Sequence, residues 1–165
     1  MTTTFDFGDG NGPVPAHRHA NPGGSEGGWV ADTAIVAPTA FVGSDAMVFG
    51  EAQVLENAVV GGTAEVSGKA VVRGRARVCG SARVCQWAEV YGSASVSGHA
   101  EISDEARVGG NARVSGNAVV TDYARVHGGT SVHGDAKVAG EVVLEGGRFD
   151  RGVIHETPSV DGPKM

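Results

Sequence analysis

The sequence predicts an all-β fold, a parallel β-helix in which very short strands coil around one narrow core. An aliphatic residue recurs at every sixth position from Val30 to Leu144 without a slip. A small residue, usually Ala, lies two places before each of them, and Gly is the commonest residue two places after. Because only 5% of the residues are aromatic, these small aliphatic side chains must form the core.

Each six-residue unit, Ala-x-Val-x-Gly-x, predicts a short strand followed by a turn. Ala and Val are two residues apart, so on a strand their side chains point to the same face. The Gly position permits a bend with positive φ, which bulkier residues resist. One unit cannot bury its own apolar face, so the units must coil and stack until their Val and Ala side chains fill a shared interior.

The placement of charged residues predicts three of these units in each coil. Stacked strands lie roughly 4.8 Å apart, so side chains one coil apart touch. At a separation of three units the opposite-charge pairs are Glu51 with Lys69, Glu65 with Arg83, Arg83 with Glu101, and Glu89 with Arg107, and the like-charge pairs are Arg107 with Arg125 and Asp104 with Asp122. Since opposite pairs outnumber like pairs, we expect a triangular prism of about six coils.

The first 28 residues lie outside the repeat. Residues 1–28 are rich in Gly, Pro and polar residues, and such a segment cannot bury enough apolar area to fold alone. We expect an N-terminal arm that is either disordered or docked on another chain. Phe5 and Phe7 supply apolar anchors, and the Pro13-Val14-Pro15 step stiffens the backbone between them and the repeat.

The repeat itself predicts a rod over residues 29–146, and its phase fails by Asp150. Residues 147–165 are therefore expected to form a C-terminal cap and a polar tail. Val153 and Ile154 are the apolar residues that could close the open end of the core.

Outward positions in the first coils are unusually apolar. A patch of this kind marks a subunit or partner contact more often than chance exposure. The alternative is that the N-terminal arm folds back and covers it, and the sequence leaves both open. Together with Phe5 and Phe7, the residues of this expected oligomer or partner contact are Ile35, Phe41, Met47, Phe49, Leu55 and Val59.

The repeat resembles that of the hexapeptide-repeat proteins over residues 29–146. This resemblance implies a left-handed parallel β-helix, often a homotrimer, in a family that includes acetyl-CoA-dependent acyltransferases and γ-carbonic anhydrases. Here the place directly after the aliphatic residue holds side chains such as Phe49, Tyr91 and His127, where enzymes of the family usually carry a small residue. The variant is more similar to the regular Val-x-Gly-x-Ala-x proteins of bacteria and phages.

Composition argues against two classes of partner. A formal net charge of −6 and a pI near 5.4 disfavour binding to a phosphate backbone, which needs clustered Lys and Arg. No stretch approaches the length needed to span a bilayer, and the first residues lack the basic and apolar regions of a signal peptide. We expect neither a nucleic-acid nor a membrane partner, and a location in the cytoplasm, or in the virion if the chain is phage-encoded. Cys79 and Cys85 are expected to be free thiols, because their spacing fits neither a zinc site nor a redox motif.

Histidines are the candidates for chemistry that the family resemblance raises. Acyl transfer in that family needs a general-base His in a cleft between subunits, and His99, His127 and His133 occupy outward places. No loop interrupts the repeat to build such a cleft, so we expect no catalytic residue, no cofactor and no metal. His17 and His19 form a His-x-His pair that could hold a metal at a trimer axis, which stays open as an alternative.

One edge of the expected prism is the best candidate for binding. Three successive coils replace the Gly of the repeat by Gln86, Asp104 and Asp122, and Trp87, Glu105 and Tyr123 follow them directly. Stacked carboxylates repel unless a cation, a proton or a donor lies between them, and aromatic rings beside carboxylates can hold a sugar or a cation. The structural alternative is that Asp tolerates the turn conformation nearly as well as Gly.

The sequence thus favours a non-catalytic structural or binding module. We expect a homotrimeric component of a particle or surface, such as a phage capsid-decoration or tail protein, with a protein partner bound through the N-terminal arm. The alternative is a hexapeptide-repeat acyltransferase that uses acetyl-CoA, or a γ-carbonic-anhydrase-like metal protein.

Overall fold

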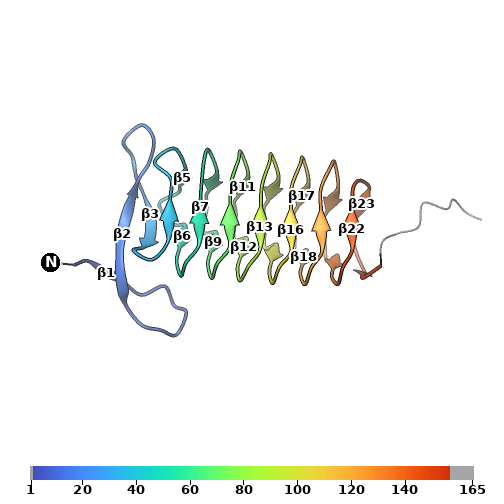
Figure 1. The fold of residues 1–165 in the computed structure, drawn as a ribbon, viewed down its shortest axis with the longest axis horizontal. Coiled ribbons are helices and arrows are strands. Elements are labelled where there is room, and N and C mark those ends of the chain that lie inside the picture. The colour runs from blue at the N-terminus through green and yellow to red at the C-terminus, as the bar shows by residue number, and fades with distance from the viewer. Residues whose placement is uncertain (1, 157–165) are drawn as a thin grey trace, which may run out of the picture.

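The protein is a parallel β-solenoid of three sheets. The computed structural model describes residues 2–156, and this part of the chain contains no helix. Figure 1 shows the coils stacked side by side along the rod, with β1 and β2 at one end and β22 and β23 at the other. The rod makes about seven turns, one more than the repeat alone predicts.

Each sheet forms one face of the prism. From one edge to the other, the first face consists of β1 (Thr4–Phe5), β2 (Val14–Ala20), β3 (Glu26–Ala31), β6 (Met47–Val48), β9 (Glu65–Val66), β12 (Arg83–Val84), β15 (Glu101–Ile102), β18 (Val119–Val120), β21 (Lys137–Val138) and β24 (Val153–Ile154). The second face consists of β4 (Ile35–Val36), β7 (Gln53–Val54), β10 (Val71–Val72), β13 (Glu89–Val90), β16 (Arg107–Val108), β19 (Arg125–Val126) and β22 (Val143–Leu144). The third face consists of β5 (Phe41–Val42), β8 (Val59–Val60), β11 (Arg77–Val78), β14 (Ser95–Val96), β17 (Arg113–Val114), β20 (Ser131–Val132) and β23 (Arg148–Phe149).

The coil of three repeat units is confirmed. Strand pairing joins Val36 to Val54 at the start of the second face and Val126 to Leu144 at its end, and each step between them again spans three units. The Val and Ala side chains of the repeat are buried inside, most of them completely. Together the coil and the three sheets support the left-handed β-helix that the family resemblance implies.

Ion pairs along the faces follow the same register. The expected pairs Glu51–Lys69, Glu65–Arg83 and Glu89–Arg107 have N–O distances of 3.6, 3.4 and 3.8 Å. Arg83 also lies in register with Glu101 on the next strand. The basic partner of each pair is about half exposed or more, so each pair stabilises the fold by under about 1 kcal/mol and mainly reports the register.

The last coil is shorter than the others. Val132 pairs with Phe149 where a full coil would bring Asp150, and Val138 pairs with Ile154 where a full coil would bring Glu156. Phe149 and Ile154 both pack against the end of the core, so Ile154 helps to close it as expected, whereas Val153 is 62% exposed. The rod therefore runs past residue 146, because apolar residues at five-residue steps still reach the interior. The rest of the expected tail, residues 157–165, lies outside the described part.

Residues 2–28 form an ordered N-terminal cap, so the expectation of a disordered arm is wrong. Strand β2 pairs antiparallel with β3, and β1 pairs antiparallel with β2, which extends the first face beyond the first coil. The Phe7 side chain is buried, and its ring stacks on Phe49 at a centroid distance of 4.9 Å. Phe5 stacks on Trp29 at 4.6 Å. Docking of this segment on another chain stays a prediction.

The cap covers part of the apolar patch and leaves the rest open. Met47 and Phe49 pack with the cap aromatics, as the fold-back alternative requires. Ile35 and Phe41 are 55% and 40% exposed, and Leu55 and Val59 are half-buried.

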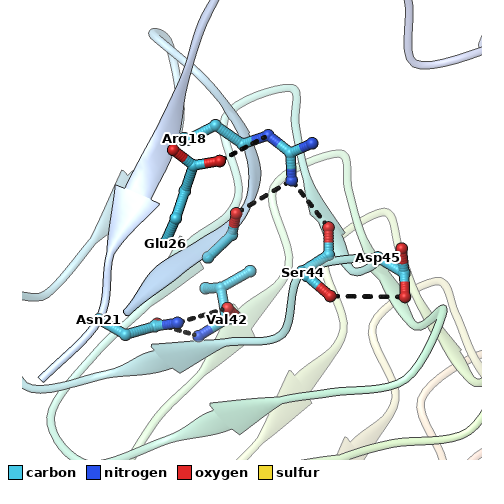
Figure 2. Close-up of polar contacts among 7 residues, drawn as sticks. Arg18, Asn21, Glu26, Val42, Ser44 and Asp45 are labelled. Carbon is cyan, nitrogen blue, oxygen red and sulfur yellow. Dashed lines mark hydrogen bonds and ion pairs between the residues drawn. The ribbon is translucent and has the colours of Figure 1, made fainter. Parts of the chain in front are cut away.

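Polar side chains of the cap complete the backbone hydrogen bonds of the first coil. The Asn21 amide receives the Val42 N–H at 2.8 Å and donates to the Val42 carbonyl at 3.0 Å, as a neighbouring strand would. Arg18 donates to the Gly27 and Ser44 carbonyls at 3.1 and 2.9 Å. Figure 2 shows these contacts around the start of the third face. An open sheet end is a template for pairing with other chains, and at the start of the third face Asn21 occupies the backbone groups of Val42 that such pairing would use.

Candidate ligand-binding edge

The structure brings the six predicted binding residues together. They lie in the turns between β12 and β13, β15 and β16, and β18 and β19, which stack along one edge of the prism. With Gly68 and Lys69 they line a groove of about 470 Å³. We call this feature the aromatic–acidic edge, made of Gln86, Trp87, Asp104, Glu105, Asp122 and Tyr123.

Three residues of this edge adopt a backbone conformation that normally requires glycine. The φ angles of Gln86, Asp104 and Asp122 are 60°, 57° and 60°. Neighbouring coils keep Gly at the same place, with φ of 68° at Gly50 and 64° at Gly68. The turn alternative is therefore consistent with the backbone, since Asp and Asn tolerate this region better than most residues do.

Side-chain hydrogen bonds run along the edge from coil to coil. The Gln86 amide oxygen accepts the Asp104 N–H at 2.7 Å, and the Asp122 carboxylate accepts the Gly140 N–H at 2.8 Å. Between them, the Asp104 carboxylate receives the Asp122 N–H at 3.4 Å and the Thr121 hydroxyl. Each polar side chain thus binds the turn of the following coil, and these donors offset the repulsion of the stacked carboxylates.

The Asp104 carboxylate is held in its charged form. The hydrogen bond from the Thr121 hydroxyl, followed by that from the Asp122 N–H, lowers the pKa of Asp104 below its ordinary value of 3.8. Thr121 is itself buried and accepts a hydrogen bond from the Ser103 hydroxyl at 3.2 Å. The orientation of this carboxylate is consequently set by groups beneath the surface.

Two aromatic rings stand on the edge in open solvent. Trp87 is 62% exposed and Tyr123 is 57% exposed. The ammonium group of Lys69 lies over the Trp87 ring, 4.5 Å from its centroid, and also contacts Glu51 at 3.6 Å. Because this cation lies against one side of the indole, the ring has a fixed support on the rod.

A second groove borders the first on the neighbouring face. Its volume is about 630 Å³, and it shares Lys69, Trp87 and Glu105 with the first groove. Its floor lies on the second face, where Gln53, Val71 and Glu89 stand on successive strands. The Trp87 ring therefore stands between two connected depressions.

The predicted histidine candidates do not converge. His133 accepts a hydrogen bond from the Arg148 guanidinium at 2.7 Å, and His127 lies 3.7 Å from Glu145. His99 is exposed. Within the described residues, no group of three or more His, Cys, Asp or Glu side chains is placed to hold a metal ion.

The His-x-His pair takes part in the N-terminal cap. His17 lies 2.8 Å from the Asp32 carboxylate, and the buried His19 donates to the Ala40 carbonyl at 3.0 Å. Each imidazole thus has a partner within the chain, and His19 contributes to the closure of the first coil.

Comparisons with protein-family models, with curated proteins and with solved structures find no match to this chain. The coil geometry is consistent with a hexapeptide-repeat β-helix. Among residues 2–156 there is no helix that could span a membrane.

Sequence reasoning missed three residues of this region. Lys69 precedes Trp87 by one full coil, so the repeat alone could have placed it beside the ring. Ser103 and Thr121 are also one coil apart, yet the repeat only indicates that they stack, not that Thr121 turns its hydroxyl to Asp104.

Proposed function

We propose that this protein is a non-catalytic structural or binding module, a stiff rod that presents one side edge to a ligand and one end to other subunits. The observation that carries this proposal is the unbroken register of the coil, in which every pairing from β4 to β22 joins strands three units apart. No segment in that stretch leaves the rod to form a lid or a wall.

The coil supports this role through its stability. Each buried Val contributes roughly 1.5–3 kcal/mol, and such residues recur in every turn of the rod. Backbone hydrogen bonds between coils continue through the turns, for example from the Trp87 N–H to the Asp104 carbonyl at 2.8 Å. Surface residues therefore change little in position on binding, which suits a scaffold.

The proposed assembly is a homotrimer that forms part of a particle or surface, such as a phage capsid-decoration or tail protein. Ile35 and Phe41 flank the first turn between the second and third faces, and both remain exposed beside the cap. Val59 stacks on Phe41 one coil further. This apolar corner offers a subunit contact, while contact of the cap with a different protein stays a prediction.

The oligomer can be tested by light scattering on the full-length protein at micromolar concentration. We expect a trimer, and we expect Phe41→Asp to shift it towards monomer because a charge enters the apolar contact. Val153→Asp is the matched control, since Val153 is also apolar and exposed but lies at the opposite end of the rod. A wild-type protein that is only monomeric contradicts the assembly.

One observation favours the acyltransferase alternative. The His127 imidazole faces the Glu145 carboxylate at 3.7 Å, and a carboxylate that orients an imidazole is a common general-base arrangement. Titration calorimetry with acetyl-CoA separates the two functions. We expect no binding heat. Stoichiometric binding that is lost in His127→Gln and kept in His99→Gln would replace the structural proposal by the enzymatic one.

A further inference from the structure

We propose that the aromatic–acidic edge binds a linear, uncharged oligosaccharide laid along the rod, with sugar rings stacked on Trp87 and Tyr123. The inference rests on the proposed function, because it names the ligand class of the binding module. Its supports are the spacing of the two rings, the polar groups between them and the charge of the groove.

The two rings are not explained by the turn that carries them. Backbone geometry accounts for Gln86, Asp104 and Asp122, which replace glycine and bind the next coil. The following place requires no large side chain, since most units hold Asn, Thr, Arg, Ser, Asp or Glu there. Trp87 and Tyr123 are the aromatic exceptions from residue 57 to residue 141, and both fall on this edge. Exposed rings gathered where the fold does not need them indicate a binding surface.

The spacing of the rings suits an extended ligand. Trp87 and Tyr123 lie two coils apart, with Glu105 on the coil between them, so their backbones are separated by about 9.6 Å. A cation midway between the rings would lie about 4.8 Å from each, within the roughly 6 Å over which a ring attracts a cation, so the spacing alone does not exclude a cation. The Trp87 ring already carries the Lys69 ammonium group. A chain of flat sugar rings can instead place separate units on the two aromatics.

The groups between the rings accept hydrogen bonds. Asp104, Glu105 and Asp122 line the same groove and supply carboxylate oxygens, and sugar hydroxyls are the donors that such oxygens bind. The Asp104 carboxylate is oriented by the buried Thr121 hydroxyl. A hydroxylated ligand therefore meets an acceptor that is already in place, which reduces the entropy lost on binding.

The charge of the groove excludes acidic ligands. Three carboxylates face one ammonium group, that of Lys69, among the lining residues. Phosphates and uronic acids are repelled by this arrangement, and a neutral polyol is not. The connected groove on the second face gives a longer chain room to continue beyond Trp87.

Affinity electrophoresis and titration calorimetry with neutral hexasaccharides, namely cellohexaose, mannohexaose and chitohexaose, test the inference on the full-length protein. We expect at least one to bind, and we expect Trp87→Ala and Tyr123→Ala each to weaken its binding about tenfold. Tyr91→Ala is the matched control, because Tyr91 lies under Arg73 on a different edge. The hexasaccharide should bind more tightly than its disaccharide, and Tyr123→Ala should remove that advantage.

Three results would overturn the inference. The first is the failure of all three hexasaccharides to bind at millimolar concentration. The second is equal weakening by Tyr91→Ala and Trp87→Ala. The third is Trp87-dependent binding of tetramethylammonium with no binding of the sugars, which would make the edge a cation site.

The failure of the proposed function is recognised separately. Acetyl-CoA binding that depends on His127 would contradict the proposal of a non-catalytic module. Sugar binding at Trp87 would still be tested by its own titration. Conversely, a trimer that binds no sugar would contradict the sugar-binding inference and leave the proposed structural function in place.

Discussion

The two ends of the rod cover the open end of the core in different ways. At the N-terminal end, two antiparallel strands and the side chains of Arg18, His19 and Asn21 cover the first coil. At the C-terminal end, the final coil shrinks to five-residue steps and places Phe149 and Ile154 over the core. A coil of this kind leaves unpaired backbone groups at both ends, and only the first end has its groups taken up by an added layer within residues 2–156.

A regular repeat cannot close its own ends. Every internal coil is covered by the next one, whereas an end coil needs residues that depart from the pattern. The N-terminal cap adds two antiparallel strands and the amide and guanidinium groups of Asn21 and Arg18, and the last coil uses larger apolar side chains in place of Val. The first solution contributes more hydrogen bonds and more aromatic packing, so we expect it to hold its end more firmly.

Among the substitutions at the two ends, Phe7→Ala should destabilise the protein most. Phe7 is 7% exposed and packs on Phe5 and Phe49, so its removal leaves a cavity and should cost about 3 kcal/mol in the free energy of unfolding. Denaturant unfolding of both proteins measures the loss. Phe7→Leu serves as the control and should lose clearly less, because it refills most of the volume. Equal stability of Phe7→Ala and the wild type would mean that the cap does not hold the first coil.

Asn21→Ala is expected to have the next largest effect. The substitution leaves the buried Val42 N–H and carbonyl without their partners, at a cost of about 2 kcal/mol. The Val42 amide should exchange its hydrogen faster than in the wild type, and the exchange rates of the middle coils should stay unchanged. Asn117→Ala is the control, since the exposed Asn117 amide only donates to Asp135. If the Val42 amide keeps its protection in Asn21→Ala, the strand-like role of Asn21 is refuted.

Phe149→Ala tests the opposite end and should cost less. Phe149 is half-buried at the end of the core, so we expect a loss of about 1.5 kcal/mol, half of that at Phe7. In the wild type, amides of residues 143–154 should already exchange faster than those of residues 41–54. The opposite order of exchange would reverse the comparison of the two ends.

The smallest expected effect lies in the middle of the rod and depends on pH. The pKa of Asp104 is lowered in the folded protein, first by the Thr121 hydroxyl. Its contribution to stability is therefore present above the unfolded pKa of about 4 and is lost as the pH falls through the lower folded value. Asn tolerates the same turn as Asp. The melting temperature of Asp104→Asn should therefore fall less than that of the wild type as the pH is lowered through about 4.

Two comparisons make that pH experiment decisive. Glu105→Gln removes the adjacent carboxylate without touching Thr121 and serves as the matched control. Asp9, whose pKa is lowered by the Asn11 N–H, is unchanged in both variants and cancels. An equal fall of the melting temperature with pH in Asp104→Asn and the wild type would contradict a stabilising role for the charged Asp104.

Much of the candidate site follows from the coil length. Once three units make one coil, Gln86, Asp104 and Asp122 must stack, and Trp87 and Tyr123 must share an edge. The exposure of both rings could also be expected, because their place in the unit points outward. The hydrogen bonds from each side chain to the next turn could not, since they depend on rotamers that the repeat does not specify.

The sequence alone predicted the strands, the core and the register, because a strict six-residue period gives each unit one inward face and the placement of charged residues favours stacking at three units. It did not determine the ends. Residues 2–28 look like an unstructured arm in isolation, and only the exposed backbone and apolar edge of the first coil give Phe7, His19 and Asn21 something to bind. Likewise, the five-residue steps to Phe149 and Ile154 break the six-residue pattern. These two side chains reach the core only because its open end leaves room for larger residues. Local periodicity sets what repeats, whereas closure depends on contacts between segments that share no pattern, and those exist only in the folded molecule.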